Sequence, residues 1–334
     1  MHRAEADVLV IGAGIAGLLA ARRLTAAGLR ALVIERGNVP GGRLATSRVG
    51  RGYADTGAQF FTVRSPEFAQ IVDGWLQQGL VFVWSNGWSD GSLLSVFPDG
   101  YPRYAARGGF GALAQRLADG LTIRTGVSIT SVALERGVWR ATGADGFVAE
   151  ATALLLTPPV PQSLALLDRS GVELPAVARS TLGLIQYGPC LCGLFAIEGT
   201  ALLPSPGVLQ RPDAPISWIA DNRQKGISPE AGVLTVHMGI AAAEARWRQE
   251  DAAILAWMWA EVSPWLDTEA TFGAARLIRW REAIPLRVHP DPYFSVETLP
   301  APLLFAGDAF AGPRVEGAAL SGMAAANALL GRMV

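Results

Sequence analysis

The chain has 334 residues and a net charge of −1, with 50% hydrophobic and 17% charged residues. This composition can fill a substantial core, and the absence of a basic block gives no indication of a nucleic-acid or anionic membrane surface. The apolar runs all fall short of the roughly 18 to 20 residues that span a bilayer. The first of them, Val8 to Ile11, is only as long as a strand, so we expect neither a signal peptide nor a membrane span.

The two cysteines, Cys190 and Cys192, lie two residues apart in an expected strand and would share a face. We expect buried thiols in a reducing cytoplasm. His2, His237 and His289 are too scattered to complete a ligand set, so we expect no metal site.

The first 35 residues have the pattern of a dinucleotide-binding unit. An apolar strand from Asp7 to Ile11 precedes GAGIAG, an amphipathic helix from Ile15 to Ala26, and a second strand from Leu29 to Ile34. The strand before the glycines and the helix after them make the motif more specific than its letters alone. The pattern predicts a bound adenine dinucleotide and leaves open whether it is NAD or FAD.

Each glycine of that motif, and the acidic residue after the second strand, has a physical role. Gly12 would permit the tight turn, Gly14 would let the backbone approach a pyrophosphate, and Gly17 would let the helix pack closely on the sheet. The phosphates would lie at the helix N-terminus, where N–H groups and the helix dipole favour negative charge. Glu35 is placed to accept hydrogen bonds from ribose hydroxyls and to repel a 2′-phosphate.

The next segments suggest a return to the same sheet. The Gly- and Pro-rich loop from Arg36 to Gly42 leads to Arg43, which can supply positive charge to a pyrophosphate or lie solvated on the surface. The expected elements that follow are a helix, Gly108–Leu117; a strand, Leu121–Thr125; an antiparallel meander, Ser128–Leu134, Val138–Thr142 and Phe147–Ala151; and a central parallel strand, Ala153–Leu156.

The middle of the chain, about Pro161 to Thr271, is rich in tryptophan and mixes helices with strands. Its expected strands are Leu191–Ile197, Ile216–Ala220 and Val233–Met238, which suggests a substrate domain with a mixed or antiparallel sheet. A helix over residues 250–262 would turn Ile254, Trp257, Met258 and Val262 toward the core.

A second informative group of residues lies near the C-terminus. The apolar strand Leu303 to Ala306 precedes Gly307 and Asp308, and a helix rich in small residues runs from about Glu316 to Leu330. Gly307 permits close backbone approach, Asp308 offers a carboxylate to polyol hydroxyls, and the helix N-terminus offers N–H groups at Glu316 to Ala318. The small residues of this helix would let it lie close to a flat ring.

These motifs together resemble the FAD-dependent amine oxidase superfamily: GAGIAG with Glu35, GGRLATSR at 41–48, FAGD at 305–308 and VEGAALSG at 315–322. A more specific resemblance, along the whole chain, is to the renalases and their bacterial relatives. It is carried by DTGAQFFTVR at 55–64, SWIADNRQK at 217–225, RWREAIP at 279–285 and AGDAFAGPRVEGAALSG at 306–322.

The resemblance implies an α/β, two-domain fold in which a Rossmann-like FAD-binding domain of the glutathione-reductase and amine-oxidase type is interleaved with a substrate domain. We expect the FAD-binding domain over residues 1–62, 108–160 and 272–334, and the substrate domain over 63–107 and 161–271. The cofactor would be non-covalent FAD, because the last forty residues contain no cysteine or histidine. The residues expected at FAD are Gly12, Gly14, Ile15, Ala16, Gly17, Glu35, Arg36, Gly42, Arg43, Ala58, Gln59, Phe60, Val127, Thr157, Gly307, Asp308, Glu316, Gly317 and Ala318.

The resemblance also implies a reaction. Renalase-like enzymes oxidise 2- and 6-dihydronicotinamide isomers of NAD(P) to NAD(P)+, passing hydride to FAD and electrons to O2 to give hydrogen peroxide. The residues expected at the substrate and the flavin face are Gln59, Phe60, Phe61, Tyr187, Trp218 and Trp280, where the aromatic ones can equally be ordinary core residues. Arg281 and Arg287 can meet substrate phosphates or lie on the surface.

Amine oxidation is less favoured by the sequence. The better-known amine oxidases have a lysine that binds a water near the flavin, whereas the only lysine here, Lys225, lies in a polar stretch that we interpret as a loop. A flavin amine oxidase, a desaturase acting on an isoprenoid, and a scaffold that binds FAD without turnover are the alternatives. The sequence does not fix the preferred isomer, the physiological electron acceptor or the oligomeric state.

Overall fold

The computed structural model describes residues 3–91, 100–310 and 312–333. The chain forms two compact units, each built from segments that are separate in the sequence. Unit 1 consists of Met1–Gly42, Ala114–Tyr187 and Pro285–Val334, and unit 2 consists of Arg43–Leu113 and Gly188–Ile284.

Unit 1 is built on a largely parallel sheet in the strand order β16-β17-β10-β1-β2-β7, with β8 and β9 extending from β10. Its strands are β1 (Arg3–Ile11), β2 (Ala31–Ile34), β7 (Thr122–Arg124), β8 (Ile129–Glu135), β9 (Val138–Gly143), β10 (Val148–Leu156), β16 (Phe294–Ser295) and β17 (Leu303–Phe305). Val8, Leu9 and Val10 of β1 have no exposed surface, because a central parallel strand is covered on both faces.

The strand register brings the motifs of unit 1 to one edge of this sheet. Ile11 at the end of β1 pairs with Leu156 of β10 and with Ile34 of β2, and Leu156 pairs in turn with Phe305 of β17. Because these strands are parallel, Gly12, Glu35, Thr157 and Gly307 all follow carboxyl ends at the same edge, where open α/β sheets bind their ligands.

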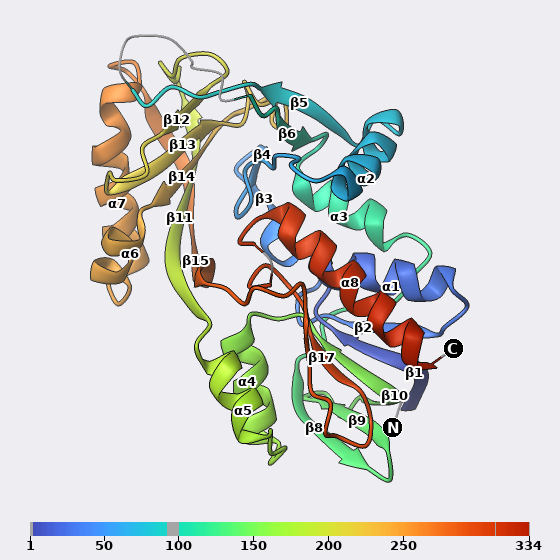
Figure 1. Ribbon diagram of the computed structural model, residues 1–334. Coiled ribbons are helices and arrows are strands. Elements are labelled where there is room, and N and C mark those ends of the chain that lie inside the picture. Colours follow the sequence, from blue (N-terminus) through green and yellow to red (C-terminus); the bar gives the residue numbers. More distant parts are fainter. Residues whose placement is uncertain (1–2, 92–99, 311, 334) are drawn as a thin grey trace. The chain divides into compact units, whose positions relative to one another are not determined.

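Two helices far apart in the sequence pack against each other in unit 1. These are α1 (Ile15–Ala26) and α8 (Val315–Met333), which lie side by side in Figure 1. A side chain at Gly322 of α8 would collide with the backbone of Ala16, so this glycine serves the packing of α8 on α1. The approach of α8 to a flat ring stays a prediction. Helices α4 (Val160–Arg169) and α5 (Ala176–Gly183) also belong to unit 1, and α4 packs on β8.

The meander differs from the sequence prediction in one respect. β10 is a single strand, which pairs antiparallel with β9 through Val148–Ala151 and parallel with β1 along its whole length. The pairing of Arg3–Ala6 with Val148–Ala151 also explains why β1 begins four residues before the predicted strand start at Asp7. The two segments that the hydrophobic pattern predicted as separate strands are therefore one strand, because both pair with β1.

Unit 2 contains a sheet in the order β12-β13-β14-β11-β15, with antiparallel pairing of β12 with β13, β13 with β14, and β14 with β11. Its strands are β11 (Gln186–Glu198), β12 (Val208–Gln210), β13 (Ile216–Asp221), β14 (Gly232–Met238) and β15 (Thr271–Arg287). Helices α6 (Ile240–Arg246) and α7 (Asp251–Val262) lie along this sheet in Figure 1. Ile254, Met258 and Val262 of α7 are buried, as predicted, and Trp257 is partly buried.

The rest of unit 2 is formed by two hairpins and two helices. They are β3 (Thr46–Val49) with β4 (Gly52–Asp55), β5 (Val81–Ser85) with β6 (Arg103–Ala106), α2 (Pro66–Gln77), and the start of α3 (Phe110–Ala118). Short 3₁₀ turns occupy Gly42–Leu44 and Ser263–Trp265.

The α/β fold with two interleaved parts agrees with the sequence analysis, but the parts divide at other residues. Residues 43–62 belong to unit 2, since β4 packs on β14. Residues 161–187 belong to unit 1, because α4 packs on β8. Residues 108–113 and 272–284 also fall in unit 2, the latter as part of β15.

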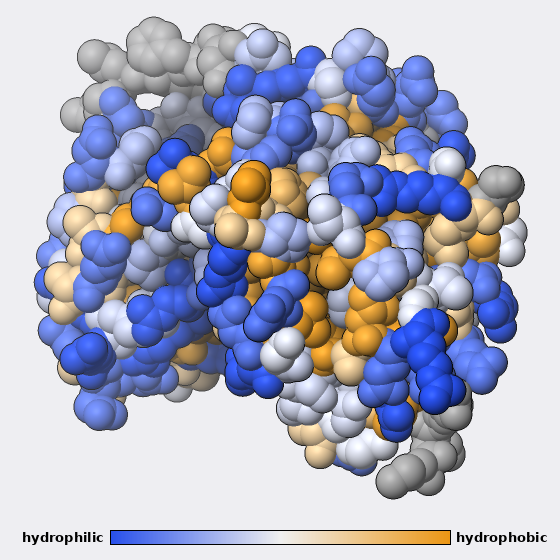
Figure 2. Space-filling model, turned by 60° about the horizontal axis from the view of Figure 1, so that its bottom comes forward, coloured by the Kyte–Doolittle hydropathy of each residue, from blue (hydrophilic) through white to orange (hydrophobic). Residues whose placement is uncertain are grey.

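The face seen in Figure 2 carries hydrophilic residues with groups of hydrophobic residues between them. Among the described residues, no helix combines the length and the apolar composition that a membrane crossing requires.

Candidate functional site

The glycine motif of unit 1 has the geometry of a dinucleotide turn. Gly12 has a φ of +99°, which side chains rarely adopt, and a side chain at Gly17 would collide with the Gly12 carbonyl. A Cβ at Gly14, by contrast, would meet nothing within 4 Å. Gly14 is also the N-cap of α1, and no side chain caps that helix. The N-terminus of α1 therefore has no side-chain cap and has space beside Gly14, as an anion-binding helix end requires.

Glu35 holds this turn together. Its carboxylate accepts hydrogen bonds from the amides of Ala13 (2.8 Å) and Gly37 (2.7 Å), and the residue is only 9% exposed. Each carboxylate oxygen has a second lone pair, so the group can still accept from a ribose hydroxyl. The sequence analysis predicted the ribose role but not these two backbone bonds.

Two other expected FAD residues are engaged in the same turn. The Thr157 hydroxyl donates to the carbonyls of Ile11 (2.8 Å) and Gly12 (3.1 Å), which makes it part of the turn itself. The Val127 amide donates to the Glu35 carbonyl (3.0 Å), so a backbone contact from Val127 to adenine would have to use its carbonyl.

The C-terminal residues add a second polar position at this sheet edge. Gly307 follows β17 with a φ of +145°, and its amide donates to the Ser321 hydroxyl at 2.9 Å. Asp308 is 9% exposed and accepts a hydrogen bond from the Tyr187 hydroxyl at 3.3 Å. Tyr187, expected at the substrate, therefore lies beside the carboxylate that we assign to the ribityl chain.

The N-terminus of α8 needs one correction. The Ala318 amide donates to the Arg314 carbonyl at 3.0 Å, so it is not one of the helix's free N–H groups. The first turn of the helix begins at Val315. Glu316 in this first turn is 7% exposed.

Unit 2 contains a fully buried ion pair. The Lys225 ammonium lies 2.7 Å from Asp55 Oδ2, and both side chains are completely buried. Asp55 Oδ1 also accepts from the Thr46 hydroxyl (2.6 Å) and from the Phe110 amide (2.8 Å). Burial lowers the pKa of Lys225, and the charge of Asp55 opposes that change. The predicted loop position of Lys225 is correct, since it lies in a turn after β13, but its burial was not foreseen.

The backbone next to Asp55 is fixed by side chains from several elements. The Asp55 carbonyl accepts from the Thr235 hydroxyl (3.0 Å) and from the Gln59 side-chain amide (2.8 Å). The Thr56 carbonyl accepts from the Trp280 indole (3.0 Å) and from Nε2 of His237 (3.2 Å). Residues 55–59, at the end of β4, are therefore held in one conformation.

The bond to Thr56 also defines the state of His237. Since a carbonyl can only accept, the Nε2 of His237 carries the proton. Burial, together with the smaller effect of the Lys225 charge, lowers the pKa of His237 to about 4, although the hydrogen bond to Thr56 acts in the opposite direction. The imidazole is accordingly neutral at physiological pH.

Gln59 offers an acceptor at this position. Its amide nitrogen donates to the carbonyls of Asp55 and Gly57, which fixes the orientation of the side chain. Its Oε1 is buried and has no hydrogen-bond partner in the described structure. Gln59 thus has an acceptor for a ligand N–H, and its place at the flavin or the substrate stays a prediction.

Phe60 and Phe61 point into different surroundings. Phe61 is 3% exposed and packs against Phe68, Trp75, Tyr104 and Phe110, as a core residue does. We therefore withdraw Phe61 from the predicted substrate residues.

Phe60 belongs instead to an aromatic group that we call the tryptophan cluster, formed by Phe60, Trp84, Trp88 and Trp218. The Phe60 ring stacks on Trp218 at a centroid distance of 5.5 Å and meets Trp88 edge to face at 5.1 Å. Phe60 is partly buried, whereas the three tryptophans are 5 to 9% exposed.

Other expected residues have structural contacts. Trp280 is anchored by its bond to Thr56, as described above. Arg43 donates to the carbonyls of Glu282 (3.2 Å) and Ala283 (3.1 Å) of β15. Arg281 lies over the Trp247 ring at 4.3 Å, and Arg36, Gly42 and Arg287 are exposed. Arg281 therefore packs on Trp247, and a contact of Arg281 or Arg287 with substrate phosphates stays a prediction.

Sequence reasoning missed Asp55, Trp84, Trp88 and His237. A signal was available for the ion pair, because the only lysine of the chain follows the buried strand β13 closely and requires an acidic partner if it is buried. The spacing of Trp84 and Trp88, four residues apart across a turn, gave no comparable indication.

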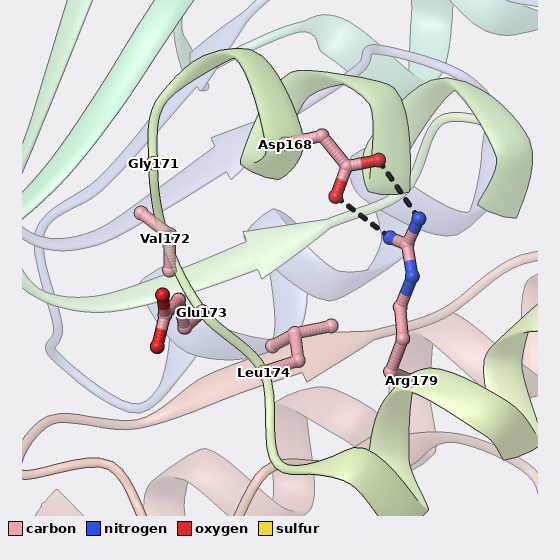
Figure 3. A pocket seen from close by; sticks show the side chains of 6 residues that line it. All are labelled: Asp168, Gly171, Val172, Glu173, Leu174 and Arg179. Carbon is pink, nitrogen blue, oxygen red and sulfur yellow. Dashed lines mark hydrogen bonds and ion pairs between the residues drawn. The ribbon is translucent and has the colours of Figure 1, made fainter.

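A surface hollow on unit 1 lies outside these positions. It has a volume of about 440 Å³ and is lined by residues from the end of α4 to the start of α5 (Figure 3). Two of its three charged residues, Asp168 and Arg179, already bind each other through two hydrogen bonds of 2.8 and 2.9 Å. We assign no ligand to this hollow.

The cysteines of β11 are buried free thiols, as predicted. Burial raises the pKa of Cys190 to about 12 and that of Cys192 well above its ordinary value. The described residues contain no group of three or more His, Cys, Asp or Glu side chains placed to hold a metal ion.

The unit 1 geometry defines a dinucleotide-binding protein of the Rossmann-like class. A family model described as an NAD(P)-binding Rossmann-like domain matches residues 10–75, and the model of flavin-containing amine oxidoreductases matches residues 77–330. The chain therefore belongs to the flavin-containing amine oxidoreductase family, and its cofactor is FAD.

Two curated proteins are similar to short segments of this chain. Hydroxyneurosporene desaturase of Rhodobacter capsulatus is 37% identical over 109 residues, 29% of this chain and 21% of that protein. Putrescine oxidase of Kocuria rosea is 41% identical over 69 residues, 21% of this chain and 14% of that protein. The matched segments thus span about a fifth or less of these relatives.

Solved structures show the same fold over the whole chain. A structure of putrescine oxidase bound to putrescine has a TM-score of 0.72 at 15% identity and covers 99% of this chain and 100% of that one. A putative protoporphyrinogen oxidase from Exiguobacterium sp. 255-15 has a TM-score of 0.75 at 14% identity, with all of both chains covered.

Proposed function

We propose that this protein is an FAD-dependent oxidase of the renalase type, which oxidises 2- or 6-dihydronicotinamide isomers of NAD(P). The observation that carries the proposal is the state of Lys225, the only lysine of the chain. Its ammonium is completely buried and bound to Asp55 at 2.7 Å, so it is not available to bind a catalytic water as the lysine of amine oxidases does.

A dihydronicotinamide does not need such a group. Losing a hydride restores the aromaticity of its ring, so the protein has to hold a flat ring in place and need not supply a strong base. The polar groups of unit 2 fit this requirement, because His237 is neutral and donates to Thr56, and Asp55 is neutralised by Lys225. The aromatic side chains of the tryptophan cluster suit a planar ligand.

The residues of unit 1 would hold FAD as the family requires. The open N-terminus of α1 at Gly14 fits a pyrophosphate, Glu35 fits the adenosine ribose, and Asp308 fits the ribityl chain. Bound FAD would accept the hydride and pass two electrons to O2, so that dihydronicotinamide, O2 and a proton give NAD(P)+ and hydrogen peroxide.

Anaerobic mixing of the FAD-loaded protein with a panel of donors tests this proposal. The panel contains the 2- and 6-dihydro isomers of NAD and NADP, ordinary NADH, and amines including putrescine. We expect rapid loss of the visible flavin absorbance with the isomers and slow or no loss with NADH and amines. Loss with amines alone would select the amine oxidase alternative, and loss with neither would leave the desaturase and scaffold alternatives.

A further inference from the structure

The tryptophan cluster contains an unusual set of buried donors. The indole N–H groups of Trp84, Trp88 and Trp218 are all buried, and none has a hydrogen-bond partner in the described structure. The indoles contact one another edge to face, with centroid distances of 4.9 Å between Trp84 and Trp88 and 5.4 Å between Trp88 and Trp218. Three indoles that contact one another thus each carry an unpaired buried donor.

Such donors need an explanation. Leaving a buried donor unpaired costs about 1 to 3 kcal/mol, so buried indole N–H groups usually have a partner. The Trp139 indole of unit 1 shows the ordinary situation, because it is fully buried and donates to the Pro302 carbonyl at 3.0 Å. The cluster lacks an acceptor that a ligand can provide.

Cations next to the cluster strengthen these donors. The Lys225 ammonium lies 4.8 Å from the centroid of the Trp84 ring, and the Arg103 guanidinium lies 5.4 Å from that of Trp88. A cation over an indole face withdraws electron density from the ring and makes its N–H a better donor. The cluster therefore favours an acceptor oxygen attached to a flat ring, which can lie against the aromatic side chains.

We propose that the indole N–H groups of the tryptophan cluster bind the carboxamide oxygen of the nicotinamide ring. This inference rests on the proposed function for the identity of the ring, and on the unpaired donors for the contact. A carboxamide oxygen has two lone pairs and can accept from two indoles at once. The unpaired Oε1 of Gln59, which precedes Phe60 in the chain, is suited to the NH2 of the same carboxamide.

Binding of oxidised dinucleotides tests the contact without turnover. NAD+ is compared with its thionicotinamide analogue, whose sulfur is a weak acceptor, and with its acetylpyridine analogue, which keeps the oxygen and lacks the NH2. Dissociation constants come from the perturbation of the flavin spectrum on titration. We expect the wild-type protein to bind NAD+ about 2- to 10-fold more tightly than the thio analogue, the range of one hydrogen bond. The acetylpyridine analogue keeps the contact of its oxygen with the indoles and should lose only the contact of the NH2 with Gln59.

Trp84→Phe, Trp88→Phe and Trp218→Phe each remove one donor and keep an aromatic ring. The preference for oxygen over sulfur should fall toward one in at least one of these variants. Trp139→Phe is the matched control, since its donor is already paired within unit 1, and it should keep the wild-type preference. An unchanged preference in all three cluster variants, or none in the wild type, would overturn the proposal.

A second measurement uses the wild-type protein and so tests the contact even if the variants fail to fold. In wild-type protein labelled with ¹⁵N-tryptophan, addition of NAD+ should move indole N–H resonances assigned to the cluster downfield and leave that of Trp139 in place. No movement of the cluster resonances at saturating NAD+ would show that only water meets these donors. Failure of the proposed function is read separately, from the flavin absorbance with the dihydro isomers, because neither binding measurement requires hydride transfer.

Discussion

At the scale of single residues, the candidate site depends on buried polar groups that are fixed by named partners. The carboxylate of Asp55 accepts from Lys225, Thr46 and Phe110, and the carbonyl of the next residue accepts from His237 and Trp280. Sequence reasoning identified Gln59, Phe60 and Trp218 in this unit but not Asp55 or His237. The reason is physical: a buried polar group shows its role only when its partner is known, and Lys225, His237 and Trp280 lie about 170 to 225 residues beyond the groups that they bind.

The ion pair predicts a large stability effect. Lys225→Met leaves the Asp55 carboxylate buried without its counter-charge, which typically costs about 3 to 5 kcal/mol. We expect a loss of that size in the free energy of unfolding, measured by urea denaturation. Arg116→Ala is the control, because Arg116 and Asp119 form an exposed pair that should contribute less than about 1 kcal/mol. Equal losses in the two variants would contradict the assigned role of Lys225.

His237 predicts a pH dependence of stability. Its pKa falls from 6.5 to about 4 in the folded protein, so between these values the unfolded chain binds the proton and the folded protein does not. Stability contributed by neutral His237 is therefore present above pH 6.5 and is lost as the pH falls toward 4, by at most about 3 kcal/mol.

His237→Gln can retain a donor to the Thr56 carbonyl but cannot titrate. We expect the free energy of unfolding of this variant to fall less steeply than that of the wild type between pH 6.5 and 4.5. The measurement is urea denaturation at a series of pH values. Parallel curves for the two proteins would show that His237 does not carry this dependence.

At the scale of elements, the βαβ unit at the N-terminus was the most predictable part of the chain. The glycine spacing and the apolar strands located α1 and the turn before it, because these features are local. The sequence did not show that β10 is continuous, nor that α8 packs on α1, because both depend on neighbours far away in the chain. The same holds for residues 43–62, which belong to unit 2 through the packing of β4 on β14.

Two glycines at this turn give a prediction that separates folding from cofactor binding. Gly14→Ala places a methyl group in open space, so the protein should fold with nearly unchanged stability while its affinity for FAD falls. Gly17→Ala places a methyl group against the Gly12 carbonyl and should destabilise unit 1 itself.

Thermal unfolding of the FAD-free proteins and titration with FAD measure the two effects. Gly74→Ala is the control: Gly74 lies within α2, and a methyl group there would meet nothing within 4 Å, so neither property should change by much. Tight FAD binding by Gly14→Ala would contradict the placement of the pyrophosphate at α1.

At the scale of the whole molecule, sequence and structure agree on an FAD-binding unit interleaved with a second unit. Composition and motifs predicted the fold class and the cofactor, because the dinucleotide turn and the FAGD segment lie in short, local stretches. They could not predict the tryptophan cluster, which joins β5, the loop after it, β13 and the segment after β4. The tryptophan cluster of unit 2 is thus the part that required a structure.

The central claim is that a dihydronicotinamide isomer delivers its hydride to FAD in this protein. The most direct measurement is an anaerobic titration of the FAD-loaded protein with purified 2- or 6-dihydroNAD(P), following flavin absorbance and the NAD(P)+ formed. We predict that one equivalent of isomer bleaches one equivalent of flavin and yields one equivalent of NAD(P)+, and that admitting O2 restores the absorbance. A flavin that stays oxidised with every isomer, and is bleached by an amine instead, would contradict the account.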